Sequence, residues 1–315
     1  MRRYLGVFAL LCLVQGQNDS LVSTYYSSGA QKSLGFYTEG VRDGLWTEWY
    51  DGEVYEDFGA DGQPNTQDEG EGNGIWDSTE IITLDLNNNG VYDLPQLSTD
   101  GFYISGNRDS LWIFWYPNGN KKERALYKNG KLNGHLSKWY DNGNRKEGGV
   151  YVGGVQDSVW TWFYKNGIKE EEAFFTDGEQ EGKWTFWYED GTKKEVRKYV
   201  NGEKDSTWVV WYPNGNRKSL VTYVDGKLTG PWISWYEDGI FKEKSGEYKV
   251  NKLHSLWTTW SEKGRKTEEI TYDNGAKSGP WVQWNSFGDK VLEGRFKKSE
   301  KDGEWIYFYD NGLKE

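Results

Sequence analysis

The stretch WIFWYPNGNKKERALYKNGKLNGH, residues 112–135, is one full copy of a unit that returns every 24 residues along most of the chain. A fixed period of this length indicates a repeat array, in which each unit buries its apolar surface against its neighbours. One extra residue precedes the copy that starts at Trp257. The copies begin at Trp46, Trp112, Leu136, Trp160, Trp184, Trp208, Trp232, Trp257, Trp281 and Trp305.

The unit itself predicts a β-hairpin. Residues 112–116 are aromatic and favour a strand, and Pro117-Asn118-Gly119-Asn120 forms a turn in which a positive φ costs little. Residues 121–127 form the return strand, and a second Asn-Gly turn at residues 128–131 leads to the next copy. We therefore expect an all-β fold: an elongated, open-ended, twisted antiparallel meander of tandem hairpins.

Both faces of such a sheet carry aromatic side chains. Because side chains alternate along a strand, Trp112, Phe114 and Tyr116 share one face, while Ile113 and Trp115 share the other. A second large aromatic follows the first by three residues in nearly every copy, as in Trp112/Trp115. The alternation alone does not say which face meets solvent.

Composition and charge restrict the function. The 315 residues are 36% hydrophobic yet 17% aromatic, which is unlike a disordered chain, and the net charge is −11. An acidic chain lacks the basic surface that phosphate backbones require, so nucleic acid is not expected as a partner. No segment is apolar over the length that a transmembrane helix needs.

The N-terminus resembles a signal peptide, because Arg2 and Arg3 precede an apolar run from residue 4 to residue 14. Cleavage after Gly16 leaves a mature protein without cysteine, which is expected outside the cytoplasm, secreted or in a bacterial envelope. A lipoprotein attached through Cys12 is the alternative, but Leu11 stands where a small residue is preferred.

Four segments follow: a signal peptide (1–16), N-terminal repeats (17–52), an acidic Asn- and Gly-rich insertion (53–100) and the main array (101–315). Two copies of a possible calcium loop lie in the insertion at an offset of 16 residues. Oxygen-bearing side chains recur at the spacing of an EF-hand-type loop, with glycine at its sixth position. The predicted ligands are Glu69, Glu71, Asn73, Asp77 and Glu80 in the first copy, and Asp85, Asn87, Asn89 and Asp93 in the second.

Gln96 stands at the twelfth position of the second loop, where calcium loops prefer a bidentate Glu. The insertion is similar to the calcium-wrapped acidic repeats of extracellular thrombospondin type 3 modules, which implies a structural Ca²⁺. The alternative is a solvated acidic loop whose Asn-Gly pairs only form turns.

A basic residue recurs two positions after the turn glycine, and it allows two interpretations. Lysine at strand ends discourages aggregation, or the row binds an acidic polymer or anionic lipid. The row comprises Lys121, Arg145, Lys169, Lys193, Arg217, Lys266, Lys290 and Lys314.

No catalytic motif is visible, so we expect no enzyme. Ser110, Ser158 and Ser206 alternate with glycine in successive copies and are interpreted as turn residues, as are His135 and His254. Residues 109–123 resemble residues 205–219, at an offset of 96 residues, which indicates a segmental duplication.

The unit W-x-x-W-Y-x-N-G-x-x-K…Y-x-x-G-x-x-x-G resembles the MORN repeat variant of the bacterial YwqK antitoxin family, over residues 20–50 and 101–315. The resemblance implies the repeat fold and, by family name only, an antitoxin-like role. We expect a scaffold that binds a protein partner; carbohydrate binding through exposed aromatics is the alternative. The chain stops at Glu315 just after an Asn-Gly turn, which indicates either a fragment of a longer protein or an open sheet edge able to pair with another strand.

Overall fold

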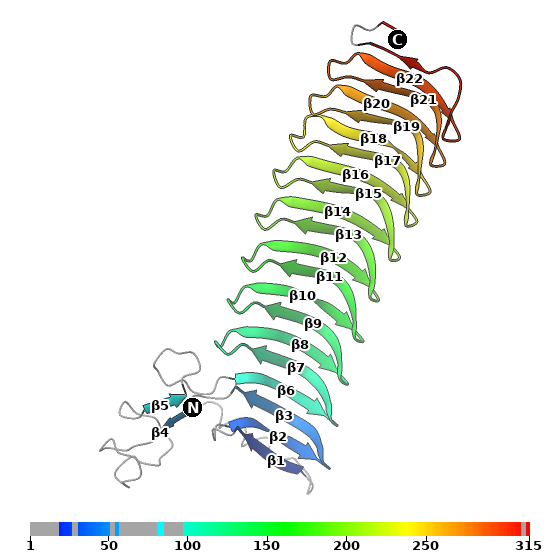
Figure 1. Cartoon of the computed structure of the whole chain (residues 1–315). Coiled ribbons are helices and arrows are strands. Elements are labelled where there is room, and N and C mark those ends of the chain that lie inside the picture. Colours follow the sequence, from blue (N-terminus) through cyan, green and yellow to red (C-terminus); the bar gives the residue numbers. More distant parts are fainter. Residues whose placement is uncertain (1–18, 27–30, 51–53, 57–80, 85–96, 310–312) are drawn as a thin grey trace. The chain divides into compact units, whose positions relative to one another are not determined.

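The computed structural model describes residues 19–26, 31–50, 54–56, 81–84, 97–309 and 313–315 (Figure 1). These residues form strands and turns with no helix, which confirms the all-β prediction. Within them, accordingly, no helix is long and apolar enough to cross a membrane. The chain divides into two compact units, the first comprising residues up to 145 with 151–154, the second residues 146–150 and from 155 onward.

The first unit is an antiparallel meander in which each strand pairs with the next along the chain. β3 (Val41–Trp49) pairs directly with β6 (Leu97–Ile104), with Trp49 opposite Leu97, so the chain between them leaves the meander. There β4 (Val54–Glu56) and β5 (Ile81–Leu84) form a separate two-stranded sheet. The strands of the meander are β1 (Asp19–Tyr25), β2 (Gln31–Thr38), β3 (Val41–Trp49), β6 (Leu97–Ile104), β7 (Asn107–Trp115), β8 (Lys121–Lys128) and β9 (Lys131–Trp139), and β10 (Arg145–Val152) is divided between the two units.

The second unit is an antiparallel meander of the same kind (Figure 1). Strands of nine and eight residues alternate over residues 155–297, and the last two strands have two residues each. Near Glu315 the chain turns back, with a bridge between Phe308 and Lys314. The strands are β11 (Val155–Phe163), β12 (Lys169–Thr176), β13 (Glu179–Trp187), β14 (Lys193–Val200), β15 (Glu203–Trp211), β16 (Arg217–Val224), β17 (Lys227–Trp235), β18 (Lys242–Lys249), β19 (Lys252–Trp260), β20 (Lys266–Asp273), β21 (Ala276–Trp284), β22 (Lys290–Lys297), β23 (Glu300–Lys301) and β24 (Ile306–Tyr307).

Two kinds of turn connect the strands, and the sequence accounts for both. In the tight turn at Asn129-Gly130 both residues have positive φ, 51° and 78°, which is the geometry that Asn-Gly favours between paired strands. The wide turn spans Tyr116 to Asn120, where the Gly119 amide donates to the Tyr116 carbonyl at 2.9 Å. The prediction of a hairpin joined to its neighbour by a further tight turn is therefore confirmed.

A β-bulge interrupts every long strand at the position where serine and glycine alternate. Ser110, Ser158 and Ser206 have φ of 58°, 59° and 58° and lie inside β7, β11 and β15. In β17 the residues between Leu228 and Trp232 outnumber those between their partners Tyr223 and Val221.

The interpretation of these serines as turn residues was wrong, because the bulge, and not a turn, requires the left-handed backbone conformation. His135 and His254 likewise lie inside strands, in β9 and β19.

Candidate interaction surface

The first aromatics define one face of the sheet, which we call the inner face. Trp112 and Trp160 are each 1% exposed, although a single sheet has no second layer to cover them. The rings of Trp112 and Trp160 each lie over a glycine of the preceding strand: a Cβ added to Gly101 would stand 2.1 Å from the Trp112 ring, and one added to Gly149 would stand 2.3 Å from the Trp160 ring. The Trp160 Nε1 also donates to the Val150 carbonyl at 3.1 Å. Trp112, Trp184, Trp208 and Trp257 repeat this bond with Phe102, Phe174, Lys198 and Glu247.

Cations and further aromatic rings cover what remains of these tryptophans. The Arg42 guanidinium lies 4.0 Å from the Trp46 ring centroid, and that of Arg108 lies 4.5 Å from Trp112. Phe114 stacks on Trp112 at 6.0 Å with its plane inclined by 27°, which confirms that alternate residues share this face. These first aromatics therefore stabilise the array and offer little surface to a ligand.

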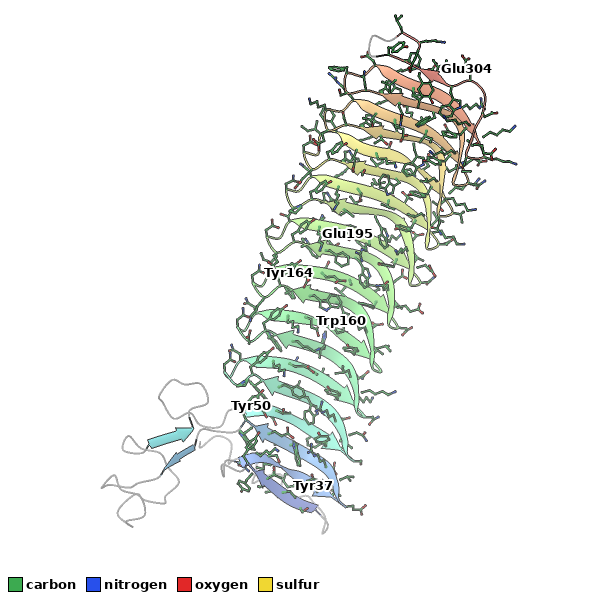
Figure 2. The ribbon with its side chains drawn as sticks, in the orientation of Figure 1. Tyr37, Tyr50, Trp160, Tyr164, Glu195 and Glu304 are labelled. Atoms are coloured by element: carbon green, nitrogen blue, oxygen red, sulfur yellow. The ribbon has the colours of Figure 1, made fainter. Side chains whose placement is uncertain are left out.

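Carboxylates on the inner face differ in how they are satisfied. Glu195, labelled in Figure 2, accepts two hydrogen bonds from Arg197, both at 2.8 Å. The Arg197 guanidinium lies over the Phe186 ring. Burial raises the pKa of Glu171, and the positive charge of Arg197 opposes this effect only in part. On the inner face, therefore, Glu195 is well paired, whereas the charged form of Glu171 is destabilised by desolvation.

The opposite face, which we call the outer face, carries the second aromatics. Trp187, Trp211, Trp235 and Trp260 are half-buried there, each paired in register with a basic residue at the start of the next strand. The Lys169 Nζ lies 5.3 Å from the Trp187 ring centroid, and that of Lys193 lies 5.7 Å from Trp211. Aromatic rings and cations therefore alternate across the outer face.

An aliphatic row runs beside the aromatic one on the outer face. Val196, Val209, Leu220 and Ile233 are consecutive partners across β14, β15, β16 and β17, and all four are half-buried. Val159 and Phe174, paired in β11 and β12, are 50% and 38% exposed on the same face. Contiguous apolar side chains that the described residues leave uncovered are typical of an interaction surface.

The basic row predicted from sequence occupies this outer face, and part of it is neutralised. Lys169 pairs with Glu172 at 2.6 Å and Lys290 with Glu293 at 2.9 Å, each three residues away, and Lys266 pairs with Glu269 in the same way. The row therefore does not form a continuous ladder of free cations that could bind an acidic polymer. Lys169, Lys193 and Lys266 lie over aromatic rings, and Lys169, Lys266 and Lys290 pair locally with acids.

Side chains also tie each hairpin to the next at both edges, a feature that sequence reasoning missed. The hydroxyl of Tyr164, which is labelled in Figure 2, donates to the Trp187 carbonyl at 2.7 Å. Tyr188 and Tyr212 do the same one and two units further along the chain. At the tight-turn edge, Asp109 accepts from the Asn129 amide at 3.2 Å. The recurrence of Tyr before each wide turn and of a polar residue before each bulge was the available signal.

The nine predicted calcium ligands, Glu69, Glu71, Asn73, Asp77, Glu80, Asp85, Asn87, Asn89 and Asp93, lie outside the described residues, as does the predicted signal peptide. Within the described parts of the chain, no three His, Cys, Asp or Glu side chains cluster as metal ligands would. His254 Nδ1 lies 3.6 Å from Asp273 Oδ1 in the second unit.

Four segments of the chain match the MORN repeat variant: residues 108–129, 156–177, 180–201 and 204–225. Each match covers one hairpin with its wide turn, namely β7–β8, β11–β12, β13–β14 and β15–β16. The structural unit and the sequence repeat therefore coincide. No curated protein sequence matches the chain.

Among solved structures, the crystal structure of TcdB2-TccC3-Cdc42 aligns at 11% identity with a TM-score of 0.18, covering 94% of this chain and 18% of that one. A structure of the Photorhabdus luminescens Tc holotoxin pore aligns at 10% identity with a TM-score of 0.20, covering 93% and 21%. The chain thus spans about a fifth of the length of these structures.

Proposed function

We propose that this chain is a non-enzymatic repeat scaffold that binds a protein partner on its outer face. The observation that carries the proposal is the uncovered aliphatic row of β14 to β17 beside the half-buried Trp211 and Trp235. Protein interfaces favour apolar side chains and aromatic rings at their centre. The matched MORN repeats support a scaffold, because repeat arrays present extended surfaces to partners.

Two matched triple variants test the proposal. Val209→Thr/Leu220→Thr/Ile233→Thr makes the aliphatic row polar while keeping residues that suit a strand. Val200→Thr/Val224→Thr/Val250→Thr is the control, because these side chains are 37%, 47% and 52% exposed at tight turns. Chemical crosslinking in the native host, followed by mass spectrometry, should identify the same partner with the wild type and the control, and lose it with the first variant. Equal recovery by all three proteins would contradict the proposal.

Carbohydrate binding is the second candidate, favoured by the half-buried rings of the second aromatics. Sugar faces stack on accessible rings, so a glycan ligand should protect Trp211 and Trp235 from acrylamide quenching. A glycan array without hits, together with unchanged quenching in the presence of cell-wall polysaccharide, would exclude this candidate. An antitoxin-like role rests on the family resemblance only, and rescue of growth from a co-expressed toxin tests it.

We also propose that the protein acts outside the cytoplasm and that the insertion binds a structural Ca²⁺. The motivation is the apolar N-terminal run and the spacing of Glu69 to Glu80 and of Asp85 to Asp93. N-terminal sequencing of exported protein should give a start at Gln17, whereas a lipid-modified Cys12 would mean the lipoprotein form. Calorimetry of the full chain with Ca²⁺ should release heat, and Asp77→Asn/Asp93→Asn should abolish it. Absence of heat with the wild type would exclude the site.

A further inference from the structure

The pairing of outer-face cations with acids is interrupted over five consecutive strands. Lys169, Lys266 and Lys290 each have a glutamate three residues later, with which they pair. In the repeats between them, the residue three positions after the cation is not acidic: it is Val196 after Lys193, Leu220 after Arg217 and Ser245 after Lys242. Lys193, Arg217 and Lys242 are exposed, and no ion pair joins them to an acid among the described residues. Three successive repeats therefore each carry an outer-face cation without an acidic partner. The corresponding cations on either side of them, Lys169 and Lys266, are each paired with a glutamate.

The same interruption creates the aliphatic row, since Val196 and Leu220 occupy the positions of the missing glutamates. Lys193, Arg217 and Lys242 thus stand in register with Trp187, Trp211 and Trp235, beside the row of Val196, Val209, Leu220 and Ile233. We call these three cations and four aliphatic residues the basic–aliphatic patch. Because the three cations lie on alternate strands, successive cations are separated by two strand spacings, about 10 Å.

We propose that the basic–aliphatic patch is the docking site for an acidic amphipathic segment of a protein partner, a proposal that rests on the function proposed above. An apolar row beside a row of cations is complementary to a peptide with leucine or phenylalanine on one side and aspartate or glutamate on the other. A nucleic acid would leave the aliphatic row unsatisfied and would meet a chain of net charge −11.

The charges of the patch determine how binding should depend on salt and on the removal of individual cations. Cations at the side of an apolar contact act mainly by steering and by screened attraction, so salt should weaken binding. Because Lys169, Lys266 and Lys290 already face glutamates, their removal should matter little. The chain thereby supplies its own control for loss of three positive charges on one face.

Peptide display on the full-length protein tests the proposal without knowledge of the natural partner. A random peptide library is selected on the wild type and counter-selected on Lys193→Gln/Arg217→Gln/Lys242→Gln. We expect enriched peptides that combine acidic and large apolar residues, and that bind the triple variant about tenfold more weakly, as loss of about three partly screened ion pairs implies. Lys169→Gln/Lys266→Gln/Lys290→Gln should change their affinity by less than about twofold. Circular dichroism checks that both variants keep their strand content.

Several outcomes would overturn the proposal. Enriched peptides without acids, equal weakening by the two triple variants, or no enrichment would each remove it. Vesicles containing phosphatidylglycerol form a second arm, and binding to them that requires Lys193, Arg217 and Lys242, without peptide enrichment, would assign the patch to a membrane. If the crosslinked partner needs the aliphatic row but is retained by the Lys193/Arg217/Lys242 variant, the proposed function stands and this inference fails.

Discussion

At the scale of single residues, equivalent positions of the repeat are occupied by different residues, each for its own physical reason. A serine inside β15 holds a left-handed backbone conformation and donates from Oγ to Asp205 at 2.6 Å, whereas the equivalent residue in β17 is Gly230 with φ of 105°. Serine tolerates the left-handed conformation because its short side chain hydrogen-bonds locally, and glycine tolerates it because it has no Cβ. Serine and glycine are therefore two ways to form the same bulge.

Ser206 tests this account of the bulge. Ser206→Val should destabilise the local structure by about 1–2 kcal/mol, because a β-branched side chain fits poorly at positive φ. Ser206→Gly should remain within about 0.5 kcal/mol of the wild type, since relief of strain offsets the lost hydrogen bond. Native-state hydrogen exchange of β15 and β16 measures both, and equal protection in the two variants would refute the role of φ.

Glu171 and Glu195 should respond oppositely to loss of charge. The folded-state pKa of Glu171 is raised by burial, so its favourable contribution is complete below the ordinary glutamate pKa and is lost as pH rises through the raised value. Glu171→Gln should therefore raise the melting temperature at pH 7, with the gain vanishing toward pH 4.

Glu195→Gln is the control, because it removes the charge that Arg197 binds at 2.8 Å twice, and it should lower the melting temperature at pH 7. Thermal unfolding followed by circular dichroism at both pH values distinguishes the two. A loss of stability in Glu171→Gln at pH 7 would contradict the desolvation argument.

At the scale of elements, each hairpin is tied to the next by more than its strand ladder. The tyrosine that begins a wide turn reaches the last residue of the following long strand, as Tyr212 does with the Trp235 carbonyl at 2.9 Å. The Asn118 side chain adds a bond to the Asp141 carbonyl at 2.7 Å. These bonds fix the stacking of turns, which backbone pairing alone leaves free at the edge.

Tyr212→Phe isolates the contribution of one such hydroxyl. The change should lower the local opening free energy of β16 and β17 by about 0.5–1.5 kcal/mol, the usual net value of one hydrogen bond. Tyr223→Phe is matched to it, since its ring packs with Lys204 at 5.2 Å and no described hydrogen bond involves its hydroxyl. Hydrogen exchange that shows equal effects of both changes would mean that the hydroxyl bond does not tie the hairpins.

At the scale of the whole molecule, stability is distributed along each meander and not gathered in one core. Buried tryptophans recur along the second unit at Trp160, Trp184, Trp208 and Trp257. Their ring contacts are short-range: Trp184 packs on Phe175 and Tyr199 of the adjacent strands, and Trp257 reaches Trp232 two strands away. A chain built in this way should respond locally to damage.

Trp208→Ala should therefore open β14 to β16 without unfolding the rest of the second unit. Loss of a buried tryptophan costs about 3–5 kcal/mol, and in a repeat array this cost falls on the hairpin that holds it and on its neighbours. Mass spectrometry after deuterium labelling should show loss of protection in peptides covering residues 193–224, with β20 to β22 still protected. Simultaneous loss across the second unit would show global cooperativity instead.

Sequence alone determined the period, the strands, both turn types and the alternation of faces, because these depend on residues only a few positions apart. Asn129-Gly130 and the run from Trp112 to Tyr116 specify their conformations locally. The tertiary structure decided which tryptophans are closed to solvent, which cations are neutralised and that serine lies in a bulge. Those properties depend on what the neighbouring hairpin, 24 residues away, places over a ring or beside a charge, and the one-dimensional pattern does not contain that contact.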